Sequence, residues 1–297
     1  MKVLCLGGGP AGLYFAISMK LRDPSHPVTV LERNRANDTF GWGVVLSDDA
    51  LARMQTNDPV STEAIRANFV YWDDIAVVRG TERTVSGGHG FAGIGRRQVL
   101  TLLQDSARAL GVDLRFETEF KSASDYAPDY DLVVACDGIN SAVRREFSHV
   151  FRPDIDMRLC KFVWLGTHAK FDDACTFIFE KTEHGGVWAH AYQFDTDTAT
   201  FIVECSQATW DAWGFDAITK EDTVATCQRI FAGHLGGHDL ISNAAHLRGS
   251  AVWMNFPRVI CDTWYHGNIV LMGDAAATGH FSIGSGTRLA SDSAIAL

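Results

Sequence analysis

The sequence lacks the features that mark membrane, secreted and nucleic-acid-binding proteins. No apolar run approaches the length of a helix that crosses a bilayer. Lys and Arg (26) are outnumbered by Asp and Glu (36), and the net charge of −10 argues against a nucleic-acid surface, which needs a basic face. The first apolar strand follows Met1 directly and leaves no room for a signal peptide. We therefore expect a cytoplasmic globular protein that binds neither membranes nor nucleic acids.

Paired cysteines and histidine clusters with metal-ligand spacing are also missing. The seven cysteines are scattered without a CxxC pair, mostly in apolar, strand-like settings, which is typical of free thiols in a reducing compartment. The histidines between His184 and His246 show no metalloenzyme spacing, so we expect no metal site. A chain of 297 residues without repeats or long linkers can hold two domains, or one domain with a large insertion.

Residues 2–33 read as a strand, a glycine turn, a helix and a second strand. Gly7 permits the sharp turn, Gly9 lets the backbone approach a pyrophosphate, and Gly12 lets the helix pack closely on the strand. The helix N-terminus offers free N–H groups to the phosphates. Glu32 ends the second strand, where a carboxylate can accept hydrogen bonds from an adenosine ribose. This stretch predicts a dinucleotide site, and by itself it does not separate FAD from NAD.

The rest of the chain alternates between helix–strand units and one block of strands. A helix is expected to open at Arg96, and residues 131–136 form a continuous apolar run, typical of a parallel strand covered on both faces. Residues 162–205 instead form consecutive strand-like segments, which predicts an antiparallel sheet. Residues 39–47 look like a glycine-punctuated apolar loop around Trp42. The pattern does not decide whether this loop approaches a flat ligand or is a packed surface turn.

Two further motifs each place a carboxylate directly after a strand. Asp137 opens the motif Asp-Gly-Ile-Asn-Ser-Ala-Val-Arg, and Asp274 lies in Gly-Asp-Ala-Ala after the strand predicted at 268–272. Ligands bind at this edge of open α/β sheets. With the N-terminal turn, the order and spacing of the motifs resemble the single-component FAD aromatic hydroxylases, whose model is p-hydroxybenzoate hydroxylase.

Stretches spread over nearly the whole chain narrow the resemblance. They are Gly41-Trp42-Gly43-Val44-Val45, Ser86-Gly87-Gly88-His89-Gly90-Phe91, Phe162-Val163-Trp164-Leu165-Gly166-Thr167-His168, Ala189-His190-Ala191-Tyr192, Thr200-Phe201-Ile202-Val203-Glu204 and His280-Phe281-Ser282-Ile283-Gly284-Ser285-Gly286-Thr287. This set resembles the salicylyl-CoA 5-hydroxylases and the monooxygenase half of 2-aminobenzoyl-CoA monooxygenase/reductase. A more distant resemblance is to the tryptophan-derivative hydroxylase of violacein biosynthesis.

The resemblance implies a cofactor role for residues of all three motifs. Residues of the first βαβ unit would hold the pyrophosphate and adenosine, namely Gly7, Gly9, Pro10, Ala11, Gly12, Glu32 and Arg33. Arg96 would reach the phosphates and ribityl chain, or Arg97 if its helix is shifted by one residue. Asp274 would bond a ribityl hydroxyl, and the Asp137 motif resembles the one credited with both FAD and nicotinamide-cofactor binding.

The turn Gly284-Ser285-Gly286-Thr287 would face the flavin. Reduced flavin carries negative charge around N1 and the C2 carbonyl, which backbone N–H groups at a helix start stabilise; the alternative is a simple helix-start turn. His280 precedes this turn by four positions and is the side chain expected to face flavin and substrate. It could take the ring proton or bond the amino or hydroxyl group, or its role could be structural. Trp42, Trp164, His190 and Tyr192 could line the pocket or belong to the core.

The resemblance thus implies an FAD-dependent monooxygenase that uses NAD(P)H and O2 through a flavin C(4a)-hydroperoxide. Its substrate would be an aromatic ring with an ortho amino or hydroxyl group, as an aryl-CoA thioester of the salicylyl-CoA or 2-aminobenzoyl-CoA type. The alternatives are a hydroxylase of another aromatic, such as a tryptophan derivative, and a flavin-binding fragment without turnover. Ala277 and Ser293, where relatives usually carry histidine and aspartate, favour the last.

The expected fold class is α/β, with a Rossmann-like FAD-binding domain split by an antiparallel-sheet substrate domain. We assign residues 1–70, 94–155 and 262–297 to the FAD-binding domain, and residues 71–93 and 156–261 to the substrate-binding sheet domain. The chain stops inside an apolar helical stretch without a cap. We therefore expect a C-terminal truncation, with a possible reductase domain absent from this chain.

Overall fold

The computed structural model describes residues 1–36, 38–39, 41–242, 253–284 and 286–297. Its first layer is a six-stranded, mainly parallel sheet formed by β1 (Val3–Leu6), β2 (Val28–Leu31), β8 (Asp113–Arg115), β9 (Leu132–Ala135), β16 (Tyr265–His266) and β17 (Ile269–Leu271). The strand order is β16-β17-β9-β1-β2-β8, with β1 parallel to both neighbours. This confirms the predicted α/β unit.

Helices cover both faces of this sheet, as the unbroken apolar strands predict. On one face Val3 and Cys5 pack with α1 (Pro10–Arg22), α4 (Arg96–Ala109) and α9 (Gly286–Ala296). On the other face Leu4 and Leu6 pack with α5 (Ala142–Glu146) and α6 (Ser148–Phe151). Side chains alternate across a strand, so each residue of β1 contributes to one of two separate cores.

A small third sheet lies between the two large sheets along the chain and in space. It contains β3 (Gly43–Ser47), β7 (Phe91–Gly95) and β4 (Val70–Trp72), in that spatial order. Along the chain, α2 (Asp48–Asn57) and α3 (Pro59–Arg66) lie between β3 and β4. The expectation of a loop over residues 39–47 was therefore wrong for its second half. The strand forms because it pairs with β7, about fifty positions later, from Gly43 opposite Gly95 to Ser47 opposite Phe91. A local pattern does not reveal such a partner.

The second large layer is an eight-stranded, mainly antiparallel sheet, which confirms the strand block predicted from the sequence. Its strands are β5 (Asp74–Arg79), β6 (Glu82–Ser86), β10 (Pro153–Thr167), β11 (Ala174–Thr182), β12 (Gly185–Gln193), β13 (Ala199–Cys205), β14 (Leu240–Ile241) and β15 (Met254–Cys261). The order is β14-β10-β13-β12-β11-β5-β6, and β15 pairs with β10. β11 and β5 are parallel, while β5 and β6 form a hairpin around Gly80.

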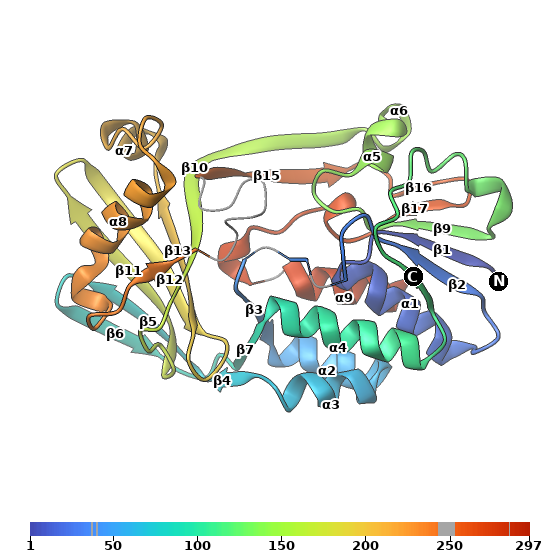
Figure 1. Ribbon diagram of the computed structural model, residues 1–297, viewed down its shortest axis with the longest axis horizontal. Coiled ribbons are helices and arrows are strands. Elements are labelled where there is room, and N and C mark those ends of the chain that lie inside the picture. The colour runs from blue at the N-terminus through green and yellow to red at the C-terminus, as the bar shows by residue number, and fades with distance from the viewer. Residues whose placement is uncertain (37, 40, 243–252, 285) are drawn as a thin grey trace.

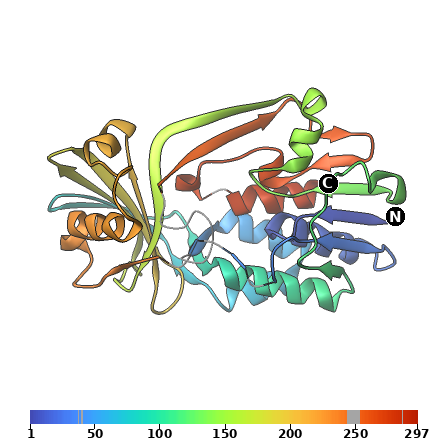
Figure 2. The same ribbon diagram turned by 45° about the horizontal axis from the view of Figure 1, so that its top comes forward.

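The long strands β10 and β15 connect the two large layers. They run side by side from the end of α6, beside the parallel sheet, to the antiparallel sheet (Figures 1 and 2). The sequence predicted a strand only from Phe162 onward, whereas β10 begins at Pro153. The predicted domain boundaries lie inside β4, inside β7, inside β10 and at the end of β15. The division into two domains stays a prediction.

The two faces of the antiparallel sheet have different surroundings. One face packs under α7 (Gln207–Ala212) and α8 (Lys220–Phe231) through a core that includes Val163, Ala189 and Val203. The opposite face, here called the inner face, is formed by the alternate residues Phe162, Trp164, Phe177, Phe179, Trp188, His190, Tyr192, Ile202 and Glu204. It contacts the small sheet, since the Tyr192 hydroxyl donates to the carbonyl of Gly43 in β3 at 2.9 Å.

Candidate active site

The glycine turn between β1 and α1 has the shape that a bound pyrophosphate requires. Gly7 has φ +118°, and a Cβ there would lie 2.3 Å from the carbonyl oxygen of Cys136. A Cβ at Gly12 would lie 2.1 Å from the carbonyl oxygen of Gly7, so the packing of the protein itself requires both glycines. A Cβ at Gly9 would meet no described atom within 4 Å. The turn is therefore open beside the N-terminus of α1, which begins at Pro10, and this opening fits a phosphate.

Glu32 is held beside this turn by three hydrogen bonds. Its Oε2 accepts from the backbone N–H of Gly8 at 2.8 Å. Its Oε1 accepts from the backbone and side-chain nitrogens of Asn34, both at 2.8 Å. The carboxylate is thus fixed at the strand end where the ribose role was predicted. Arg33, next to it, is exposed to solvent.

Arg96, at the start of α4, and Asp274, after the end of β17, lie close enough to interact electrostatically. Arg96 is the first residue of α4 as predicted, and its guanidinium lies 5.9 Å from the ring centroid of Trp164, whereas Arg97 is exposed. Burial lowers the pKa of Arg96, and attraction to Asp274 opposes this effect. Desolvation also raises the pKa of Asp274, which Arg96 and Arg144 oppose. Asp274 nevertheless remains accessible to water. Two opposite charges that are partly desolvated and still reachable by a ligand suit the binding of a polar chain such as a ribityl group.

The two carboxylate oxygens of Asp137 differ in their hydrogen bonding. Its Oδ2 accepts from the first two backbone N–H groups of α5, at 2.6 and 3.3 Å. Its Oδ1 is buried and has no hydrogen-bond partner among the residues that the structure describes. Buried polar atoms are almost always paired. An orphaned carboxylate oxygen at the edge of the parallel sheet therefore fits a bound cofactor that would donate to it.

Arg144 is a structural residue of the site that the sequence did not assign. Its side chain is almost fully buried and donates to the backbone carbonyls of Asp274 and Ala275 at 3.3 and 2.8 Å, and to that of Ile139. It thereby ties the Asp137 motif to the Gly-Asp-Ala-Ala motif. The available signal was its place as the last residue of the Asp-Gly-Ile-Asn-Ser-Ala-Val-Arg motif.

The predicted flavin turn lies at the start of α9. Gly284 has φ +62°, a Cβ at Gly286 would meet nothing within 4 Å in the described part of the chain, and Thr287 is the second residue of the helix. Ser285 lies outside the described residues. α9 packs against α1 (Figure 1), so the turn and the pyrophosphate loop belong to one group of elements. The open backbone at Gly286 fits the close approach of a flavin ring.

His280 lies between this turn and the antiparallel sheet. Its Nδ1 lies 2.7 Å from the hydroxyl of Ser282 and accepts from the backbone N–H of Ser282 at 3.3 Å. The ring contacts Phe281 and Phe256, with centroids 4.3 and 5.0 Å away. Burial lowers the pKa of His280. The ring is therefore mainly neutral at physiological pH.

The inner face approaches the flavin turn through aromatic side chains. Phe162 of β10 lies 4.5 Å from Phe281, centroid to centroid. His190 of β12 lies 6.1 Å from Phe281 and pairs with Glu204 of β13, with 2.6 Å between Nε2 and Oε1. The sequence named His190 as a possible pocket residue and missed its pairing with Glu204, because the two residues meet only across neighbouring strands.

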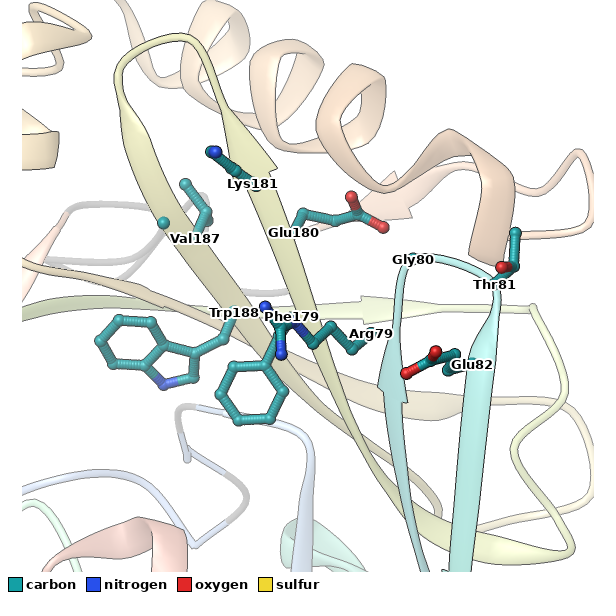
Figure 3. A pocket seen from close by; sticks show the side chains of 10 residues that line it. Arg79, Gly80, Thr81, Glu82, Phe179, Glu180, Lys181, Val187 and Trp188 are labelled. Carbon is teal, nitrogen blue, oxygen red and sulfur yellow. The ribbon is translucent and has the colours of Figure 1, made fainter.

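Of two hollows on the surface, one lies away from the predicted cofactor residues and the other reaches Gly284. The larger, about 670 Å³, is at the outer end of the antiparallel sheet, where Phe179 and Trp188 lie side by side (Figure 3). It contains none of the predicted site residues. The second, about 550 Å³, includes Gly284 and Arg288 together with Asp48, Asp49 and Asp73, and so reaches the flavin turn from an acidic side.

The structure thus collects most of the predicted residues at one edge of the parallel sheet and around the start of α9. His280 lies on the side of this group that meets the inner face. Among the described residues there is no cluster of side chains that could hold a metal ion, and no helix long and apolar enough to cross a membrane. All seven cysteines are free thiols, five of them buried.

Comparisons with known proteins identify the family of this chain and support its fold. Residues 126–297 match the FAD binding domain family. The chain is 41% identical to a salicyloyl-CoA 5-hydroxylase of Streptomyces sp, over 100% of this chain and 57% of that protein. It is 34% identical to a 3-hydroxy-4-methyl-anthranilyl-[aryl-carrier protein] 5-monooxygenase of Streptosporangium sibiricum, over 100% of this chain and 78% of that protein.

A solved structure supports the fold independently. The tetrameric form of 2-methyl-3-hydroxypyridine-5-carboxylic acid oxygenase superposes with a TM-score of 0.79 at 20% identity, covering 99% of this chain and 80% of that one. This likeness extends over both large sheets. The chain spans little more than half the length of the salicyloyl-CoA 5-hydroxylase that it matches.

Proposed function

Because this chain belongs to the FAD binding domain family, we propose that it is an FAD-dependent monooxygenase that hydroxylates an aromatic ring with an ortho hydroxyl or amino group, using NAD(P)H and O2. The observation that carries the proposal is the meeting of the inner face with the flavin turn. Aromatic side chains of the antiparallel sheet lie within ring-contact distance of Phe281, just before the turn that would face the flavin. The substrate ring would bind beside these contacts, at the border between the inner face and the loop.

Residues at the edge of the parallel sheet and at the neighbouring helix starts would bind successive parts of FAD. The glycine turn would take the pyrophosphate and Glu32 the ribose, while Asp137 would accept a hydrogen bond at its free oxygen. Arg96 and Asp274 would bind the ribityl region. The open backbone at the start of α9 would face the isoalloxazine ring. When bound, FAD supplies hydride acceptance and oxygen activation, and the protein supplies orientation and exclusion of water.

The substrate class is inferred from the relatives together with the inner face. The named substrates of both relatives are aryl groups with an ortho hydroxyl or amino group, attached to CoA or to a carrier protein. We propose that this chain takes the same class, as a salicylyl-CoA or 2-aminobenzoyl-CoA thioester. His280 would contact the ring from the flavin side, and the inner face would cover it from the other. The antiparallel layer is then the substrate-binding domain and the parallel layer the FAD-binding domain.

Substrate-stimulated oxidation of NAD(P)H tests the proposal. The FAD-loaded protein should oxidise NADH or NADPH faster when salicyloyl-CoA or 2-aminobenzoyl-CoA is added, and benzoyl-CoA, which lacks the ortho group, serves as the matched control. Stimulation by a tryptophan derivative alone would favour the alternative substrate. No stimulation by any of these rings in a flavin-replete protein would favour flavin binding without turnover.

A further inference from the structure

A buried pair on the inner face has no part in holding the cofactor. His190 and Glu204 expose only 5% and 3% of their surfaces, and Nε2 of His190 lies 2.6 Å from Oε1 of Glu204. Removing a carboxylate from water is costly, and a pair of apolar residues of similar size would often be as stable. Packing alone therefore does not explain why the sheet carries this pair.

The pair belongs to the same aromatic cluster as His280. Phe281 lies 4.3 Å from His280 and 6.1 Å from His190, and Phe177 meets His190 edge-on at 4.6 Å. The charges also interact. Burial is the main effect and lowers the pKa of His280, Glu204 raises this pKa, and His190 lowers it further. Both histidines therefore lie where the segment before the flavin turn meets the inner face.

The hydrogen bonds of His280 restrict the role of its ring. The backbone N–H of Ser282 points at Nδ1 and can only donate. Nδ1 is therefore an acceptor, and in the neutral ring the proton resides on Nε2. Nε2 can then donate a hydrogen bond to a ligand but has no lone pair with which to take a proton. Of the two chemical roles that the sequence left open, this geometry favours bonding the ortho group over removing a proton.

We propose that His190 is the proton acceptor of the substrate pocket and that Glu204 is the positioning residue that holds it. The inference rests on the proposed function, with an ortho-hydroxy aryl thioester as substrate. With Nε2 bound to the carboxylate, Nδ1 is the ring nitrogen left for the ligand. The structure contains no other buried histidine–carboxylate pair on the inner face within the described ranges.

The proton transfer balances without a further reactant. The O–H bond of the ortho hydroxyl breaks, an N–H bond forms at Nδ1 of His190, and the electron pair stays on the oxygen. The ring thereby becomes richer in electrons at the position to be hydroxylated. Glu204 stabilises the positive imidazole, as a carboxylate does for the histidine of a catalytic triad. Because His190 is screened from bulk water, the ligand does not compete with solvent for this nitrogen.

The test compares two variants in which a glutamate of the antiparallel sheet is replaced by glutamine. Glu204→Gln keeps the length of the side chain and an acceptor for Nε2, and removes only the charge. Glu180→Gln is the matched control, since Glu180 pairs with His234 at the same 2.6 Å on the side of the sheet that carries α8. The first measurement needs no turnover: the absorption spectrum of salicyloyl-CoA bound to each protein reports whether its phenol is ionised.

We expect the bound ligand to be ionised in the wild type and in Glu180→Gln, and mainly neutral in Glu204→Gln. Hydroxylation should fall by about a hundredfold in His190→Gln, the typical contribution of a positioned base, and by less in Glu204→Gln. FAD content should stay unchanged in all three variants.

A neutral phenol spectrum in the wild type would overturn the assignment, and this measurement decides the matter even if Glu204→Gln fails to fold. Equal hydroxylation by Glu204→Gln and Glu180→Gln would overturn it as well. Failure of the wild type to bind or hydroxylate salicyloyl-CoA would instead contradict the proposed function, so the two failures are distinguishable.

Discussion

Replacing Gly9 by valine should remove FAD while leaving the fold intact. Gly9 is the N-cap of α1, with φ −76° and ψ −179°, a backbone conformation open to any residue. A Cβ there would meet no described atom within 4 Å. The cost to the protein is the loss of a favourable N-cap residue, about 1 kcal/mol. The added carbons would project into the space assigned to the pyrophosphate. Crowding of this kind costs about 1–3 kcal/mol, or roughly a tenfold to hundredfold loss of affinity.

Gly12→Ala is the matched control, because its Cβ would lie 2.1 Å from the carbonyl oxygen of Gly7 and must disturb the fold itself. Flavin absorbance per protein, far-ultraviolet circular dichroism and thermal unfolding should be recorded for both variants. We expect Gly9→Val to be folded and nearly colourless, and Gly12→Ala to lose stability. Full flavin content in Gly9→Val would refute the placement of the pyrophosphate. Unfolding of Gly9→Val to the same extent as Gly12→Ala would refute the statement that the opening serves a ligand.

Three further predictions concern charged groups around the site. Arg96→Ala should weaken FAD binding about tenfold or more in a flavin titration, since it removes a charged hydrogen-bond donor, whereas the exposed Arg97→Ala should not. Arg144→Met should lower the free energy of unfolding by about 3 kcal/mol in a denaturant titration, because buried carbonyls lose a charged donor; an equal loss in the exposed Arg145→Met would contradict this. The pKa of His280 is lowered, so the unfolded chain binds more protons as pH falls through the usual value of 6.5, and stability falls with it. Between pH 7.5 and pH 5.5 the denaturant midpoint should therefore decrease more in the wild type than in His280→Asn. An equal decrease in both proteins would exclude a contribution of His280 to the pH dependence of stability.

The elements that could be predicted are those fixed by local pattern. The parallel strands appear as continuous apolar runs because both faces are covered, and the turn at Gly80 and the start of α4 at Arg96 follow from turn and helix signals. The glycine turn is recognisable because Gly7 and Gly12 are required by close backbone contacts. These features depend on neighbours in the sequence, which a single sequence displays.

What escaped prediction depends on partners far along the chain. β3 is a strand because β7 pairs with it, and the first half of β10 is a strand because β15 lies beside it. The buried bonds of Arg144 and the contact of His190 with Glu204 likewise join separate segments. The sequence could name some of these residues as candidates, and only the fold shows what they touch.

The most direct test of the proposed hydroxylation is to measure whether an oxygen atom of O2 is incorporated into the aromatic ring. FAD-loaded protein should be supplied with NAD(P)H, salicyloyl-CoA and isotopically labelled O2, and the labelled ring product counted per NAD(P)H oxidised. A hydroxylase predicts one labelled oxygen atom on the ring and nearly one product per NAD(P)H, with a lower ratio and released hydrogen peroxide in a flavin-replete His280→Ala variant. Consumption of NAD(P)H with peroxide alone, and no labelled product from salicyloyl-CoA or 2-aminobenzoyl-CoA, would contradict the proposed function.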